Sequence, residues 1–333
     1  MTKIDIFSGF LGAGKTTLIK KLIKEAYSSE KVVLIENEFG EIGIDGGFLN
    51  DAGINITEMN SGCICCSLVG DFTEALRKVI SEYAPTRVII EPSGVGKLSD
   101  VIRAVKTLGD ENALLNALVT VADANKCKMY MKNFGEFYND QIKHATAIVL
   151  SHTAKAPEKK IADSVALIRE HNGNATIVTT DWEKLSGEEM LRAIENKHTL
   201  EDAMRELEHE HHHHEHGEHC DCHEHHHHEH GEHCDCHEHH HHADEVFGSW
   251  GVETAHKFTD DGIASALREF DSGKYGTVLR AKGIVEATDG GFIHFDYVPE
   301  ECDVRRGSAA MIGRICVIGA DLREDMIKEL FGV

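Results

Sequence analysis

The sequence predicts an α/β protein in which a mostly parallel sheet, flanked by helices, is joined by a disordered linker to a smaller α+β domain. Strand-like apolar runs alternate with helical patterns over roughly the first 200 residues, as parallel sheets require. A segment of extreme composition then interrupts the pattern, and globular composition returns after it. We therefore expect domains at residues 1–200 and 244–333, joined by a linker at 205–243.

Each expected element follows from apolar periodicity. In the first domain the expected strands are Ile4–Ser8, Val32–Glu36, Arg87–Glu91, Leu118–Ala122, Ala147–Ser151 and Thr176–Thr179. The expected helices are Lys15–Tyr27, Phe72–Tyr83, Val95–Leu108 and Pro157–Glu170. In the second domain we expect strands at Thr277–Val285, Gly291–Val298 and Arg314–Ile318, and helices at Asp260–Phe270 and Leu322–Phe331.

Charge and composition exclude several classes of function. The 333 residues include 34 basic and 57 acidic side chains, and the net charge of −23 repels nucleic acid and anionic membranes. The first residues do not form a signal peptide, and no apolar run is long enough to span a bilayer. We therefore expect a cytoplasmic protein. Ten cysteines in that reducing compartment indicate metal or redox chemistry before disulfides.

The first expected strand runs directly into GFLGAGKT, residues 9–16, which fits the phosphate-binding pattern G-x-x-x-x-G-K-[ST]. Glycines let successive backbone N–H groups point at phosphate oxygens, and the following helix adds its positive N-terminal end. Lys15 would neutralise phosphate charge and Thr16 would bind Mg²⁺. The predicted nucleotide-binding residues of this loop are Gly9, Gly12, Ala13, Gly14, Lys15, Thr16 and Thr17.

A carboxylate at a neighbouring strand end would complete a Mg²⁺ site. Glu91 ends the expected strand Arg87–Glu91, so we predict that Lys15 and Glu91 are catalytic and that Glu91 holds Mg²⁺ or its water. Gly94 would let the backbone approach the terminal phosphate. Asp45, in an acidic loop after the second strand, is a further Mg²⁺ candidate; a solvated loop is the alternative.

Three clustered thiols indicate a transition-metal site. Cys63, Cys65 and Cys66 lie within GCICC, and thiolates select Zn²⁺ or similar soft ions. Glu38 and Glu41, from the acidic loop, could join them as ligands. An open fourth position would suit transfer of the ion to another protein. The isolated cysteines Cys127, Cys302 and Cys316 are instead expected to be buried as small apolar residues.

The linker is also rich in metal ligands. Residues 209–242 contain 19 histidines, 4 cysteines and 9 acidic residues, in a repeat that reads HEHHHHEHGEHCDC from His209 to Cys222 and again from His223 to Cys236. With nothing to bury, it is expected to be disordered without metal. The predicted ligands in its C-D-C pairs and their flanks are His219, Cys220, Cys222, His223, His233, Cys234, Cys236 and His237.

These motifs, taken in order, resemble the CobW-like metallochaperone GTPases, which are related to the UreG and HypB nickel-insertion GTPases. The resemblance rests on GFLGAGKTT, ENEFGEIGID, GCICC and EPSG, followed by VLRAKGIV and ICVIGADL. It implies that GTP with Mg²⁺ is hydrolysed while Zn²⁺, or else Co²⁺ or Ni²⁺, is delivered to a client metalloprotein. It also implies that the last domain is the family's C-terminal domain, for client contact or regulation.

The chain departs from the family where guanine is normally read. The family has [NST]-K-x-D after a later strand, and this chain has Ser151, His152, Thr153 and Ala154. Ser151 fits and is a predicted nucleotide-binding residue. The missing carboxylate would leave two guanine donors unpaired, at a cost of about 1–3 kcal/mol if they are buried. Guanine preference is therefore expected to be weakened, or rescued by another residue.

Two other functions compete with that of a metallochaperone. A metal storage or buffer protein with a weakened or ATP-accepting nucleotide site would explain the linker and the altered segment after residue 150. A P-loop kinase or ATPase of another type would explain Lys15 and Thr16 but leaves the thiol cluster without a purpose. The sequence leaves the oligomeric state open, a homo-oligomer included.

Overall fold

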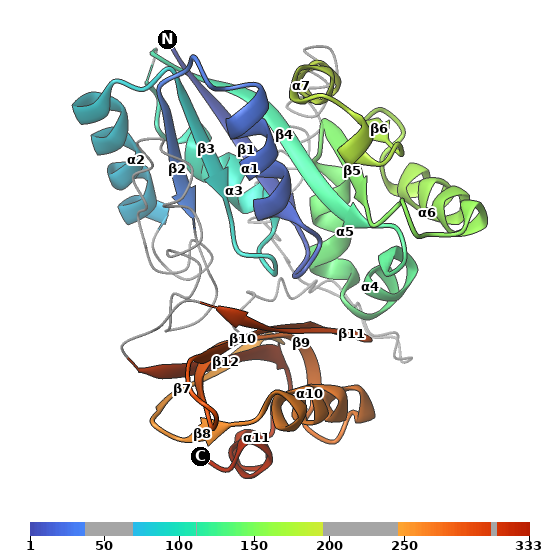
Figure 1. Cartoon of the computed structure of the whole chain (residues 1–333). Helices are drawn as coiled ribbons and strands as arrows, with labels where there is room; N and C mark the ends of the chain where they lie inside the picture. The colour runs from blue at the N-terminus through green and yellow to red at the C-terminus, as the bar shows by residue number, and fades with distance from the viewer. Residues whose placement is uncertain (37–68, 111, 196–245, 308–311) are drawn as a thin grey trace, which may run out of the picture.

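The computed structural model describes residues 1–36, 69–110, 112–195, 246–307 and 312–333. These residues form two sheets, one in each of two domains that meet along a common border (Figure 1). None of the helices in this part of the chain combines the length and apolar character needed to cross a membrane. The expected linker at 205–243 lies outside the described residues, so its disorder stays a prediction.

A six-stranded parallel sheet, in the order β2-β3-β1-β4-β5-β6, forms the centre of the first domain. Its strands are β1 (Thr2–Gly9), β2 (Val32–Glu36), β3 (Arg87–Glu91), β4 (Ala113–Asp123), β5 (Ala147–Ser151) and β6 (Thr176–Val178). They are nearly continuous apolar runs because both faces of the sheet are covered. The predicted parallel sheet is confirmed, and its strands all end at the edge that faces the second domain (Figure 1).

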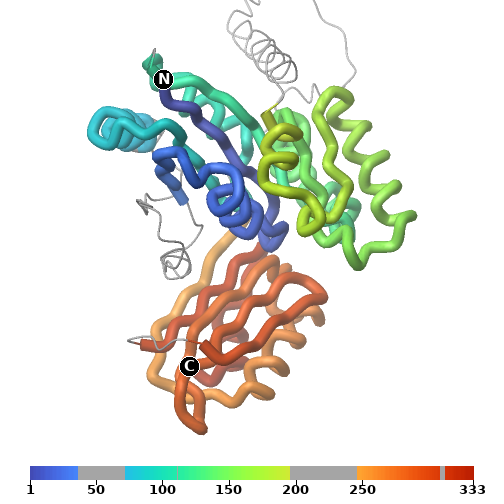
Figure 2. Tube along the Cα trace, turned by 45° about the horizontal axis from the view of Figure 1, so that its top comes forward, coloured from blue at the N-terminus to red at the C-terminus, as the bar shows by residue number. Residues whose placement is uncertain are grey.

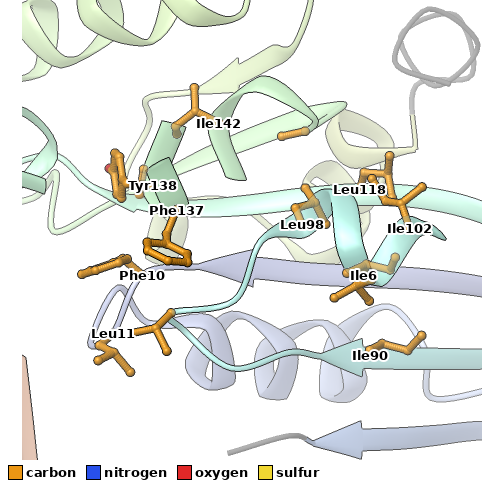
Figure 3. Close-up of a cluster of buried hydrophobic side chains, with 14 of the residues drawn as sticks. Ile6, Phe10, Leu11, Ile90, Leu98, Ile102, Leu118, Phe137, Tyr138 and Ile142 are labelled. Atoms are coloured by element: carbon orange, nitrogen blue, oxygen red, sulfur yellow. The ribbon is translucent and has the colours of Figure 1, made fainter. Parts of the chain in front are cut away.

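Helices cover both faces of this sheet. The α-helices in the described part of this domain are α1 (Lys15–Glu25), α2 (Val69–Tyr83), α3 (Leu98–Lys106), α4 (Cys127–Asn133), α5 (Gly135–Lys143), α6 (Glu158–His171) and α7 (Gly187–Ile194). Ile6 and Phe7 show the division, because successive residues of a strand face opposite ways. Ile6 packs in the cluster formed with α2 to α6, part of which Figure 3 shows. Phe7 packs in the cluster formed with α1 and α7.

A buried ion network ties the opposite edge of the sheet together. Arg87, only 1% exposed, begins β3 and donates hydrogen bonds to Asp5 on β1, to Glu30 (2.9 Å) and to Glu195 (3.1 Å). Asn116 donates to both Asp5 (2.7 Å) and Glu195 (2.8 Å). Burial raises the pKa of Asp5 in spite of the neighbouring guanidinium. The network therefore pairs a charge that could not be left buried without a partner.

The second domain is an antiparallel sheet in the order β11-β10-β9-β12-β7, with β8 added in parallel beside β9. Its elements are β7 (Gly248–Thr254), β8 (Lys257–Phe258), α10 (Asp260–Glu269), β9 (Thr277–Ala287), β10 (Phe292–Val298), β11 (Glu301–Gly307), β12 (Gly313–Ala320) and α11 (Glu324–Phe331). One face packs against α10 and α11. From the other face, Leu279, Cys316 and Ile318 join the core of the first domain, so the sheet lies against that domain (Figure 2).

The predicted α+β character of the second domain is confirmed, and the expected elements are present with ends shifted by a few residues. The expected helix Val95–Leu108 begins only at Leu98, because Gly96 N–H closes a turn on the Ser93 carbonyl (3.0 Å). The elements that were not predicted are α4, α5, α7, β7, β8 and β11. Strand β11 was missed because its residues are mostly exposed and show no apolar alternation.

Candidate nucleotide site

The loop between β1 and α1 has a backbone that only glycine adopts easily. Gly12 and Gly14 have φ angles of 71° and 96°, in the left-handed region, and Gly9 has a φ of 142°. A Cβ on Gly9 would lie 2.4 Å from the Val121 carbonyl oxygen on β4. Between the glycines, Phe10 and Leu11 are buried and anchor the loop in the core (Figure 3). The loop is thus held as a rigid turn on top of the sheet.

Lys15 curls back over this turn. It is the first residue of α1 and is 5% exposed, and its Nζ donates to the carbonyl oxygen of Gly9 at 2.9 Å, with the oxygen of Phe10 at 3.4 Å. The ammonium therefore lies at the mouth of the loop, where the backbone N–H groups and the helix N-terminus favour an anion. This is the geometry that a phosphate-binding lysine needs.

Thr16 and Glu91 are brought together, although they are far apart in sequence. The Thr16 hydroxyl donates to Oε1 of Glu91 at 2.9 Å, with Oε2 at 3.2 Å. This pairing follows from the sheet, because β3 lies beside β1 and both strands end at the same edge. A hydroxyl and a carboxylate are the oxygen ligands that Mg²⁺ prefers. Glu36 ends β2 directly opposite Glu91 and adds a buried acid beside the half-buried Glu91 at this edge.

A cleft of about 760 Å³ opens over these residues, between the two domains. The first domain contributes Gly12, Gly14, Lys15, Thr16, Thr17, Glu91 and Lys155. The second contributes Arg280, Asp296, Tyr297, Val298, Glu300, Glu301, Cys302 and Asp303. The domains touch here, because a Cβ on Gly12 would lie 2.2 Å from Cγ1 of Val298. Five of the seven predicted loop residues therefore line one cleft, and Gly9 and Ala13 do not line it. Sequence reasoning did not foresee the opposite wall.

Ion pairs hold the two walls of the cleft together beside the loop after β5. Nζ of Lys126 lies 4.0 Å from Oδ2 of Asp123 and 3.8 Å from Oε1 of Glu301 in the second domain. His152, with a φ of 57°, places Nε2 4.0 Å from the same oxygen of Asp123. Ligand atoms of Asp123, His152 and Glu301 lie within 4.8 Å of one another. The Lys126 ammonium lies near both carboxylates and offsets one of their two charges, so this group forms an ionic bridge between the domains.

Two predicted nucleotide contacts lie beneath the surface of the cleft. Ser151, at the end of β5, is 1% exposed, and its hydroxyl has no hydrogen-bond partner within the described parts of the chain. Gly94 packs against the P-loop, where a Cβ would lie 2.9 Å from the backbone nitrogen of Leu11. The carbonyl oxygen of Gly94 accepts a hydrogen bond from Gln141 (3.1 Å). The contacts of both residues with a nucleotide stay predictions.

The predicted transition-metal ligands lie outside the described residues. This holds for Cys63, Cys65, Cys66, Glu38 and Glu41, as it does for the Mg²⁺ candidate Asp45. It also holds for the linker ligands His219, Cys220, Cys222, His223, His233, Cys234, Cys236 and His237. Of the isolated cysteines, Cys127 and Cys316 are buried as expected, but the expectation for Cys302 is wrong. Cys302 is exposed because it lies on the edge strand β11 and lines the cleft.

Sequence reasoning also missed Lys155, Arg280 and Glu301 as residues of the cleft. Lys155 follows the altered guanine segment, which offered a weak signal. Arg280 lies in RAKG, part of the VLRAKGIV motif that had been noted without a role. Glu301 gave no signal, because its importance comes from the way the second domain docks on the first.

Two protein-family models match the chain, one in each domain. Residues 3–179 match the model of the CobW/HypB/UreG nucleotide-binding domain, and residues 247–333 match that of the cobalamin synthesis protein cobW C-terminal domain. The chain belongs to the CobW/HypB/UreG family. The match to the first model covers the P-loop and Glu91 of this CobW-family chain, and the match to the second covers the opposite wall of its cleft.

Several curated proteins resemble parts of this CobW-family chain. The zinc chaperone YeiR of Escherichia coli is 28% identical over 188 residues, which are 56% of this chain and 57% of the relative. The zinc chaperone CobW of Sinorhizobium sp is 36% identical over 127 residues, which are 36% of each chain. The chain thus aligns with about half or less of the length of these relatives.

Solved structures were compared as well. Zn(II)-bound YjiA GTPase from E. coli is 19% identical and has a TM-score of 0.41, with 99% of this chain and 98% of that chain covered. Hydrogenase maturation factor HypB from Archaeoglobus fulgidus is 17% identical and also has a TM-score of 0.41, with 59% and 91% covered.

Proposed function

We propose that this protein is a GTP-hydrolysing metallochaperone, which binds GTP and Mg²⁺ in the cleft between its domains. Hydrolysis would be coupled to the delivery of a transition metal to a client metalloprotein. Zn²⁺ is the first candidate, because the relatives YeiR and CobW are named zinc chaperones. Co²⁺ and Ni²⁺ are the other candidates, since the same thiolate and imidazole ligands bind them.

The observation that carries the proposal is the convergence of Lys15, Thr16 and Glu91 at one mouth of the cleft. Lys15 would offset charge on the β- and γ-phosphates, while the loop N–H groups orient them. Thr16 and Glu91 are the residues that would hold Mg²⁺, which on binding neutralises charge between the phosphates. Glu91 has two carboxylate oxygens near Thr16. One would hold Mg²⁺, and the other would orient the attacking water.

The transition metal would be held by Cys63, Cys65 and Cys66, the thiols of the GCICC segment. This segment lies in the sequence between β2 and α2, and β2 ends at Glu36 beside Glu91, so the chain that carries the thiols leaves the sheet at the Mg²⁺ edge. Loss of the terminal phosphate could therefore change how the thiols are presented. The histidine-rich linker would supply ions to them as a buffer.

The coupling is tested by four measurements of phosphate release from GTP. The wild-type protein and Cys65→Ser are each assayed with and without Zn²⁺, at an ionic strength held constant. We expect Zn²⁺ to change the turnover of the wild type and to leave that of Cys65→Ser unchanged. Equal turnover in all four would refute the coupling between metal and hydrolysis.

A metal store with a weakened nucleotide site is the second candidate, and one observation favours it. The segment that should read guanine has a buried Ser151 and an exposed Ala154 in place of the family's carboxylate. Lys15→Ala separates the two functions, because it removes the ammonium that would neutralise phosphate charge but removes no predicted metal ligand. If metal delivery to an apo-client survives Lys15→Ala intact, the store is the better description. Competition between GTP and ATP for the wild-type site then shows whether guanine is preferred.

A further inference from the structure

The second domain presents one arginine to the cleft. Arg280 lies on β9, in the sheet that packs against the first domain, and it lines the cleft together with Lys15, Thr16 and Glu91. Among the residues that line this cleft, the cations are Lys15, Lys155 and Arg280. Lys15 and Lys155 belong to the first domain, so Arg280 is the cation that faces them from the opposite wall.

Three of the four acidic residues on the same wall already lie beside other cations, and Glu300 is the fourth. Arg305, on β11, donates to Asp296 at 3.0 Å and also to Asp303. Glu301 is paired with Lys126 of the first domain at 3.8 Å. These pairs account for three of the carboxylates that line the cleft. The wall is therefore much less repulsive to a polyanion than its acidic composition suggests.

Among the described residues, Arg280 itself has no partner of this kind. It is half-buried, and no hydrogen bond or ion pair joins it to another residue in the described ranges of the chain. The other half-buried arginines of the second domain differ in this respect, because Arg305 pairs with Asp296 and Arg314 pairs with Glu253 at 3.1 Å. A guanidinium carries five N–H donors, so an unpaired one beside a P-loop is suited to a bound anion.

The contact between the domains indicates where a bound anion would lie relative to Arg280. Val298 follows the β10 residues that pair with β9, and it packs on Gly12 of the P-loop. The glycine loop and Lys15 would enclose a phosphate chain from one side. The side that they would leave open is that of the second domain, whose Arg280 lines the same cleft.

We propose that Arg280 binds the terminal phosphate of the nucleotide across the cleft, so that the second domain distinguishes a triphosphate from a diphosphate. Arginine suits this role because its planar fork can donate two parallel hydrogen bonds to a phosphate. Hydrolysis and phosphate release would remove this contact and loosen the second domain from the first. The proposal rests on nucleotide binding in the cleft, as proposed above, and adds the residue that reports the state of the nucleotide.

The test compares Arg280→Ala, Arg280→Lys and the control Arg314→Ala in the full chain with Mg²⁺. Arg314 is also half-buried and lies on the neighbouring strand β12, but its partner is Glu253 and it does not line the cleft. Affinity is measured by titration with fluorescently labelled GDP and with a labelled, non-hydrolysable GTP analogue. Thermal unfolding of each unliganded variant reports whether the fold is retained.

We expect Arg280→Ala to lower the affinity for the triphosphate analogue by roughly 10- to 100-fold, as loss of a charged hydrogen bond does. The affinity for GDP should fall by less than about 3-fold. Arg280→Lys should fall between the wild type and Arg280→Ala, because it keeps the charge but loses the fork. Arg314→Ala should bind both nucleotides like the wild type. If Arg280→Ala weakens both nucleotides equally, or neither, the proposal is wrong. If the wild type binds neither nucleotide, the proposed function itself fails.

Discussion

Gly12 is where the P-loop contacts the second domain. Its replacement by alanine should lower the free energy of unfolding in two separable ways. The first cost is conformational, because a φ of 71° is unfavourable for an L residue by about 1–2 kcal/mol. The second is steric, because the new Cβ would lie 2.2 Å from Cγ1 of Val298. Overpacking of this kind costs about 1–3 kcal/mol. Gly12→Ala should therefore destabilise the protein by about 2–5 kcal/mol.

A second substitution, Val298→Ala, should remove the steric cost and leave the conformational cost. Val298→Ala removes Cγ1 and keeps Cβ, which would lie 3.2 Å from the new methyl group and can move by a few tenths of an ångström. In the double variant the steric cost should disappear while the conformational cost remains. Gly14→Ala is the matched control. Its φ is 96°, and its Cβ would meet Trp182 (2.9 Å) of the first domain, not Val298.

The assay is urea unfolding of each single and double variant, followed by circular dichroism and by tryptophan fluorescence. Trp182 and Trp250 are the two tryptophans of the chain: Trp182 packs against a core cluster of the first domain, and Trp250 is buried in the core of the second. We expect a coupling of at least about 1 kcal/mol between Gly12→Ala and Val298→Ala, and additivity within about 0.5 kcal/mol for the pair with Gly14→Ala. Additivity in both pairs would show that β10 does not rest on the P-loop in solution.

Three further predictions concern the charged groups of the first domain. Glu91→Gln should slow phosphate release from GTP by roughly 100-fold or more, because it removes charge from the Mg²⁺ edge; nucleotide affinity measured without Mg²⁺ should stay unchanged. Arg87→Met should destabilise the protein by about 3–5 kcal/mol in urea unfolding, because it leaves the buried carboxylate of Asp5 without its cation. Burial opposes ionisation of Glu195, but hydrogen bonds from Asn116 and Lys3 and the charge of Arg87 outweigh it and lower the pKa below 4.5. The ionised side chain thus stabilises the fold above pH 4.5, and this contribution is lost as the pH falls through the lowered pKa. Glu195→Gln should flatten the decline in unfolding free energy as the pH falls below 4.5, and an unchanged slope would contradict the assigned contacts.

The elements of the first domain were predictable because their signals are local. The strands β2, β3 and β5 were predicted to the residue, since short, continuous apolar runs end at polar or turn residues. The glycines of the P-loop were also assigned correctly to a turn between β1 and α1. Helices α4 and α5 were missed, because they are short, are separated only by Phe134, and show little periodicity. Strand β11 was missed for a related reason, since its exposed residues carry no apolar pattern.

From the sequence came the parallel α/β sheet, the phosphate loop and the pairing of Thr16 with a carboxylate at a strand end. Such features depend on residues close together in the chain, or on the rule that parallel strands end at one edge of their sheet. Only the tertiary structure decided that the nucleotide cleft has a second wall. The contacts of Val298 with Gly12, and of Glu301 with Lys126, join surfaces whose residues look like ordinary strand ends in the sequence. Docking of two domains depends on the shape and charge of whole faces, and no local pattern encodes which faces will meet.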